Sequence, residues 1–93
     1  MTLKTTSFDV SEHLDSPEMI AAYLAEAFAT GESAFIADAL GLVARAKGMT
    51  DIAKRAGLSR ESLYKALSKE GHPEFETILR VLKALDVNLS VSA

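Results

Sequence analysis

Cysteine and tryptophan are absent from this chain of 93 residues, and its two histidines are His13 and His72. Without cysteine the protein has no disulfide, no thiolate zinc site and no thiol nucleophile. The two histidines lie far apart in the sequence, and neither has the spacing of a metal ligand. The carboxylates are dispersed, and the sequence has neither a Gly-rich phosphate loop nor a nucleophile motif. We therefore expect a protein that is not an enzyme and that needs no cofactor or metal.

Long apolar runs are missing as well. No run approaches the roughly 20 apolar residues that a membrane span requires. Residues 1–10, with one lysine among alternating polar residues, are typical of neither a signal peptide nor a transit peptide. With 48% hydrophobic and 25% charged residues, the composition is that of an ordinary globular protein. We expect a single domain over residues 1–93, located in the cytoplasm and without membrane contact.

Charge is distributed unevenly along the chain, although the formal net charge is only −3. Residues 1–40 contain one lysine against seven carboxylates, a balance of −6. Residues 45–69 contain seven lysines and arginines against two carboxylates, a balance of +5. This asymmetry favours a basic face for an anionic partner and an acidic face directed elsewhere. The alternative is that most of these charges only solvate helices, and charge alone does not decide between the two.

Apolar spacing predicts two long helices in the first half of the chain, after an extended lead-in over residues 1–15. Ser16 can cap the first helix and Pro17 suits its first position, and the apolar pattern then continues until Gly31. A second helix is predicted over residues 32–47, ended by a glycine. Gly41 inside it costs about 1 kcal/mol relative to alanine, so we expect a close helix crossing there. The aromatic side chains expected in the core of the domain are Tyr23, Phe28, Phe35 and Phe75.

Three helices and a strand are predicted in the second half. Two short helices over residues 50–56 and 59–69 are followed by a last helix that begins around residues 72–74. The buried stripe expected for the last helix is Phe75, Ile78, Leu79, Leu82 and Leu85. Residues 87–92 alternate between apolar and polar, which predicts a short C-terminal strand. A single strand needs a partner, either residues 5–10, a second copy or another protein.

Residues 49–69 have the pattern that a helix-turn-helix requires. Two short helices that cross steeply need a small residue where their backbones meet, and Ala53 fits that place. Gly57, four residues later, can adopt a positive φ without strain and so permits a sharp turn. The side chains expected to face the core are Ile52, Ala56, Leu58, Leu63, Ala66 and Leu67. Together with a basic exposed face, this pattern favours DNA binding over a plain helical hairpin.

The second short helix would then project its first turn into the major groove as a recognition helix. Arg60 can donate two parallel hydrogen bonds to a guanine edge. Glu61 can accept from a cytosine amine or simply orient Arg60. Ser62 and Tyr64 are suited to phosphates as well as to bases.

The remaining predicted DNA-binding residues act on the phosphate backbone or hold the helix in place. Thr50 can offer its hydroxyl and the adjacent amides to a phosphate. Ser59 is expected to cap the second helix. Lys54, Lys65 and Lys69 add attraction that does not depend on base sequence.

Nearly the whole chain, from about Phe8 to Val91, resembles the addiction-module antidote proteins. These are antitoxins of type II toxin–antitoxin pairs with an Xre/Cro-type helix-turn-helix. The resemblance lies in SFDVSEHLDSPEMIAAYL, in ARAKGMTDIAKRAGLSRESLYKALSKEGHPEFETILRVLKAL and in DVNLSVSA. It implies an all-α, five-helix domain of the Xre/lambda-repressor-like type, here with a short C-terminal β-strand. His72 departs from the expected asparagine-like cap, which puts the local start of the last helix in doubt.

The resemblance also implies partners. Members of the family are dimeric repressors of their own operon that bind and neutralise a toxin, usually a RelE-like ribonuclease. A toxin that acts on RNA should be basic, so an acidic face within residues 1–40 can cover it, with Glu12, Asp15 and Glu18 as candidates. We expect the dimer surface on the last helix and at Val87, Leu89 and Val91. A stand-alone repressor and a helical module that binds only protein are the competing interpretations.

Overall fold

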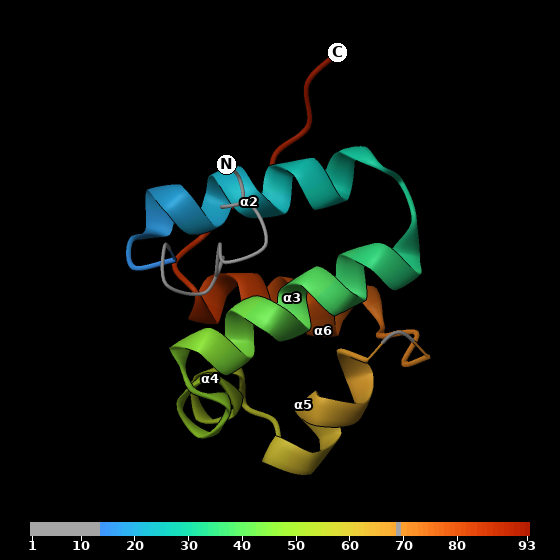
Figure 1. Cartoon of the computed structure of the whole chain (residues 1–93). Coiled ribbons are helices and arrows are strands. Elements are labelled where there is room, and N and C mark those ends of the chain that lie inside the picture. The colour runs from blue at the N-terminus through green and yellow to red at the C-terminus, as the bar shows by residue number, and fades with distance from the viewer. Residues whose placement is uncertain (1–13, 69) are drawn as a thin grey trace, which may run out of the picture.

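The computed structural model describes residues 14–68 and 70–93, and this part of the chain forms five α-helices, as predicted. They are α2 (Pro17–Ala29), α3 (Ser33–Lys47), α4 (Met49–Ala56), α5 (Arg60–Ala66) and α6 (Phe75–Ala84). In Figure 1, α2 runs across one side of the molecule, with α3 below it and α6 behind α3. The helices α4 and α5 lie together on the side opposite α2. None of the described helices has the length and apolar character needed to cross a membrane.

The start of α2 follows directly from its sequence. The Ser16 side chain accepts a hydrogen bond from the Met19 amide at 3.2 Å, and Pro17 occupies the first helical position, as expected. The helix is followed by Gly31 with φ +71°, which lets the chain turn into α3. This turn brings α2 and α3 into contact with each other.

One hydrophobic core holds the helices together. Its largest fully buried side chains are Ile20, Leu24, Leu40, Val43, Leu63, Leu67 and Val81. They come from α2, α3, α5, α6 and the residue that follows α5, so each of these elements is anchored by at least one side chain. No polar or charged residue is buried in the part of the chain that the structure covers. Packing of apolar side chains is therefore what fixes the position of α5.

Three aromatic and aliphatic side chains that were expected in the core are exposed instead. Phe35 is 49% exposed, Phe75 is 63% exposed and Leu79 is 42% exposed. Phe35 and Phe75 occupy the first turns of α3 and α6, at the edge of the helix pack. The buried stripe of α6 is shifted by a few positions, because Val81 rather than Leu79 faces the core.

The prediction of a C-terminal strand over residues 87–92 is wrong for the single chain. No strand occurs among residues 14–68 and 70–93, so the described part offers no ladder for it to join. Val87 is half-buried, but Val91 is 96% exposed, so the alternating side chains do not share a buried face. Residues 1–13, which include most of the predicted lead-in over residues 1–15, the proposed partner segment 5–10 and Glu12, lie outside the described residues.

The boundaries of α5 and α6 also differ from the prediction. The α5 helix ends at Ala66, three residues earlier than expected, because Gly71 passes directly against the carbonyl groups of Lys65 and Ala66. A Cβ at Gly71 would collide with these carbonyls. The α6 helix begins only at Phe75, after His72 in a left-handed conformation with φ +49°.

Candidate nucleic-acid interface

A tight turn at Gly57 joins α4 to α5. Gly57 has φ +75° and ψ +32°, the left-handed conformation that was predicted from the sequence. The Gly57 amide donates to the Lys54 carbonyl at 3.2 Å, and the Leu58 amide donates to the Ala53 carbonyl at 2.9 Å. This pair of hydrogen bonds closes the end of α4 as a Schellman motif. The direction in which α5 leaves is therefore set by backbone geometry.

The α4 helix is held through one apolar face. Met49, Ile52, Ala53 and Ala56 are buried at spacings of three and four residues, and α4 contacts α3, α5 and α6. Ala53 is almost fully buried, as expected for a small residue at a close crossing. On the opposite face Thr50 and Lys54 are exposed, as the proposed phosphate contacts require.

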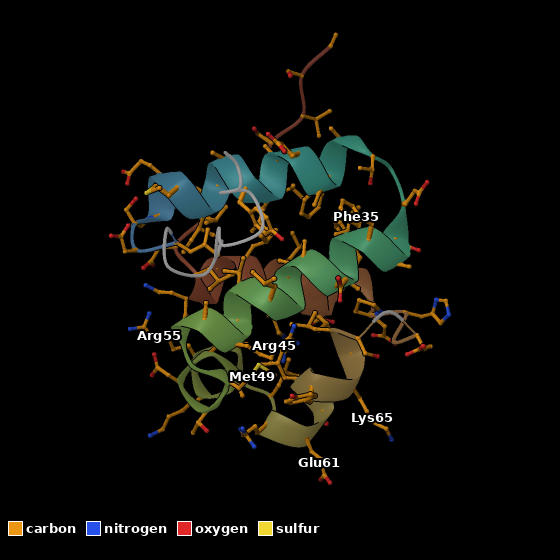
Figure 2. The ribbon with its side chains drawn as sticks, in the orientation of Figure 1. Phe35, Arg45, Met49, Arg55, Glu61 and Lys65 are labelled. Atoms are coloured by element: carbon orange, nitrogen blue, oxygen red, sulfur yellow. The ribbon has the colours of Figure 1, made fainter. Side chains whose placement is uncertain are left out.

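The α5 helix presents its first turn to solvent while its inner face is fixed. The Ser59 hydroxyl accepts from the Ser62 amide at 3.0 Å, so Ser59 is the predicted cap. Leu63 is fully buried, whereas the residues on the outer face, Arg60, Glu61, Ser62, Tyr64 and Lys65, are exposed. Figure 2 shows Glu61 and Lys65 pointing away from the other helices. The surface expected for a recognition helix is thus open.

The outer face of α5 brings four of the nine predicted DNA-binding residues into one hollow, which Ser59 and Arg60 do not line. Glu61, Ser62, Tyr64 and Lys65 line one shallow hollow together with Ser68, a residue that the sequence reasoning did not select. Ser68 follows α5 and donates its hydroxyl to the Lys65 carbonyl at 3.0 Å. Thr50 and Lys54 lie outside this hollow on α4. Lys69 lies outside the described residues.

The cations of this surface differ in how they are paired. Arg55 lies 3.4 Å from the Asp51 carboxylate and donates to the Ala84 carbonyl at 3.4 Å, so it joins α4 to the end of α6. Lys54, Arg60 and Lys65 form no ion pair within residues 14–68 and 70–93. The contacts of Arg55 were not predicted. The ion pair between Asp51 and Arg55 could have been expected, because the two residues lie four positions apart on one helix. The unpaired cations are those best placed to meet an anionic partner.

The position of α5 also depends on α3. A Cβ at Gly41 of α3 would lie 2.5 Å from the Leu67 carbonyl oxygen and 3.2 Å from the Arg45 guanidinium. The close approach predicted at Gly41 is therefore made with the chain that follows α5. Any side chain at this position would push the end of α5 outward.

Groups of three or more His, Cys, Asp or Glu residues that could hold a metal do not occur in the portion that the structure describes. Burial, and then the negative charge of Asp38, raises the pKa of Tyr23 above its ordinary value of 10.0. Tyr23 therefore stays protonated at neutral pH, and it lies on α2 rather than on the exposed face of α5.

Similarity to known proteins extends over nearly the whole chain, including every helix of this surface. A sequence model of the family described as "Probable addiction module antidote protein" matches residues 4–93. A protein of Haemophilus influenzae (strain ATCC 51907 / DSM 11121 / KW20 / Rd), described as "Uncharacterized protein", is 48% identical over 91 residues. The aligned region covers 98% of this chain and 94% of that protein. No solved structure matches the chain significantly.

Proposed function

The chain belongs to the family of probable addiction module antidote proteins, and from this membership we propose that it is an antitoxin with a helix-turn-helix of the Xre/Cro type. It binds operator DNA through α4 and α5, represses its own operon and neutralises a RelE-like ribonuclease toxin. The family membership favours this proposal over a stand-alone repressor. The unpaired cations on α4 and α5 favour it over a helical module that binds only protein.

One observation carries the DNA-binding part of the proposal. The first turn of α5 is capped and exposed on its outer face, while Leu63 fixes its inner face in the core. A recognition helix needs this combination, because its N-terminal residues must reach base edges while its axis stays fixed. The hollow along α5 carries hydroxyl, carboxylate and ammonium groups that suit the polar edges of the major groove.

Each residue has a role in the proposed complex. Arg60 reads a guanine through two hydrogen bonds, and Glu61 accepts from a cytosine amine or orients Arg60. Ser62 and Tyr64 contact phosphates or bases beside them. The backbone of the DNA is held by Thr50 and by the lysines Lys54, Lys65 and Lys69.

The proposed complex is a two-fold dimer on a palindromic operator. Two recognition helices about 34 Å apart then read half-sites one helical turn apart. We assign the dimer contact to the chain that follows α6, where Leu89 is 38% exposed and Val91 almost entirely so. In Figure 1 this tail leaves the molecule past α2, on the side away from α5, so that it leaves α5 free for DNA.

A reporter assay tests the regulatory part. A reporter gene is placed under the DNA upstream of this chain's own gene, and wild type is expressed beside the Arg60→Ala, Lys65→Ala double variant. We expect repression by wild type and loss of repression in the double variant. Lys83→Ala, which removes an exposed positive charge near the end of α6, should repress like wild type. Equal reporter activity with and without wild type would contradict the proposal.

A further inference from the structure

A large apolar surface is exposed where α2 ends and α3 and α6 begin. Phe28, Ile36, Phe75 and Ile78 line an open hollow between the three helices. Leu79 lies one turn beyond Phe75 on α6 and extends the same surface, since residues four apart are neighbours on a helix. We call these five residues the apolar end patch. Phe75 contributes most, because 63% of its surface is exposed.

Phe28, Ile36 and Ile78 pack partly against the hydrophobic core, whereas Phe75 and Leu79 are exposed, and none of the five lies on the proposed DNA surface. The residues that line the hollow along α5 are entirely different from those of the patch. Nothing within residues 14–68 and 70–93 covers Phe75 or Leu79, which stay more than one-third exposed. Exposed apolar surface that is rimmed by polar residues is a feature of interaction sites.

Most charges around the apolar end patch are negative, and Arg80, which follows Leu79, is paired with Glu76. Residues 32–44 and 70–79 contain five carboxylates and neither lysine nor arginine. Glu76 pairs with Arg80 at 3.0 Å, whereas Glu32, Glu70 and Glu74 are exposed and have no ion-pair partner in the described part. Glu32 and Glu74 are direct chain neighbours of Ser33 and Phe75, which line the hollow. The patch is an apolar centre with an acidic rim.

This charge pattern decides against a second copy of the chain as the occupant. In a two-fold contact the same patch is presented by both copies, so the carboxylates of one rim would face those of the other. Like charges across an interface oppose association. A partner with a basic surface around an apolar side chain or pocket is complementary to both the apolar centre and the acidic rim of the patch.

We propose that the apolar end patch and its carboxylates form the surface that binds the toxin, a basic protein whose apolar group packs against Phe75. This inference rests on the proposed function, because it assumes that the chain neutralises a basic toxin. The patch and the outer face of α5 use different residues, so DNA and toxin do not compete for the same side chains. The acidic first half of the chain contributes mainly through Glu32, at the start of α3.

Asp15 and Glu18, which the charge distribution of the sequence suggested as toxin contacts, lie away from the apolar end patch, so the two locations lead to opposite expectations and allow a matched comparison. Asp15 and Glu18 lie at the N-terminal end of α2, whereas Phe28 lies near its C-terminal end. Glu18 and Phe28 are ten residues apart, which is about 15 Å along the helix axis. Replacing both by lysine changes the net charge by the same amount as replacing Glu32 and Glu74. Only Glu32 and Glu74 lie on the rim of the apolar end patch.

The test measures association and dissociation between the full chain and the purified product of the gene that adjoins its own. Phe75→Ser should weaken binding about 30-fold or more, mainly through faster dissociation. Glu32→Lys with Glu74→Lys should slow association about 10-fold at low salt and much less at high salt. At about 0.1 M salt, where charges are screened over about 10 Å, Asp15→Lys with Glu18→Lys should change association by no more than about 2-fold, since these residues lie beyond the rim.

The outcomes separate the inference from the function on which it rests. If the wild-type chain fails to bind the adjoining gene product, the toxin part of the proposed function is wrong and the inference fails with it. If wild type binds but the rim and Phe75 variants bind equally well, only the inference is overturned. Phe75→Ser should keep the melting temperature and the oligomeric state of wild type. A large loss of stability would mean that the chain's own residues cover Phe75. A loss of the dimer would mean that a second copy of the chain covers it. Either result overturns the proposal.

Discussion

Gly57 is the residue on which the geometry of the DNA surface depends most directly. An L-residue with a side chain in its left-handed conformation is disfavoured, and a new Cβ would meet only the Arg80 side chain at an ordinary 3.6 Å. We expect Gly57→Ala to lower the free energy of unfolding by about 1 kcal/mol, through backbone strain alone. Urea denaturation measures this loss. Gly57→Asn should cost less, because asparagine tolerates the left-handed region, and an equal cost for both would contradict the account.

Arg60 and Lys54 should affect DNA binding in different ways. Arg60→Ala removes a base contact, so we expect the preference for the operator over other sequences to fall about 10-fold or more. Lys54→Ala removes a phosphate contact, so binding should weaken equally on all sequences, and the salt slope should fall by about one unit. Titrations on operator and scrambled DNA at several salt concentrations separate the two effects. A Lys54 variant with altered sequence preference would refute this division of roles.

The turn and the cap could be predicted from sequence, whereas the exposure of single aromatic residues could not. Gly57 and Ser59 act through the backbone next to them, so their local sequence suffices to predict their conformation and hydrogen bonds. Phe35 and Phe75 have the spacing of core residues, but each lies in the first turn of its helix, beyond the elements that would cover it. Whether a helix extends past its neighbours is a property of the tertiary structure.

At the scale of elements, the contact between α3 and the end of α5 decides where the recognition helix lies. By helix propensity alone, Gly41→Ala would stabilise α3 by about 1 kcal/mol. A Cβ at this position would lie 2.5 Å from the Leu67 carbonyl oxygen, so α5 has to move outward. We expect a net loss of about 1–3 kcal/mol in unfolding free energy.

Two measurements check this prediction for Gly41→Ala. Urea unfolding gives the sign of the stability change, and operator titration should show weaker binding because α5 is displaced. A variant that is more stable than wild type would mean that α3 and the end of α5 do not pack as closely as described.

Element boundaries were harder to predict than the elements themselves. All five helices follow from apolar spacing, and the starts of α2 and α5 also follow from their serine caps. The α5 helix nevertheless ends three residues early, where Gly71, five residues beyond its end, packs against it. The alternation over residues 87–92 has the period of a strand, yet a strand exists only with a neighbour to pair with. The hydrogen bond from Arg55 to the Ala84 carbonyl joins residues 29 positions apart, so it could not be predicted from local sequence. Only the ion pair between Asp51 and Arg55, four positions apart, follows a local spacing rule.

At the scale of the whole molecule, the account requires two copies that contact each other through the tail after α6. Leu89→Asp with Val91→Asp should weaken dimerisation about 10-fold or more, because both side chains are exposed in the single chain, Val91 to 96%. Sedimentation velocity over a range of concentrations measures the change. Ser90→Asp with Ser92→Asp adds the same charge at the alternating polar positions and should have a smaller effect. Wild-type dimerisation of the Leu89 and Val91 variant would assign the dimer contact to another surface.

The central claim is that α5 reads the base sequence of DNA, and one binding measurement tests it most directly. The full chain is titrated against the DNA upstream of its own gene and against a scrambled sequence of the same length, at several salt concentrations. The account predicts a preference for the upstream DNA of about a thousand-fold or more, with affinity falling steeply as salt rises. Equal affinity for both sequences, or no binding at low salt, would contradict it and would leave a helical protein that recognises only other proteins.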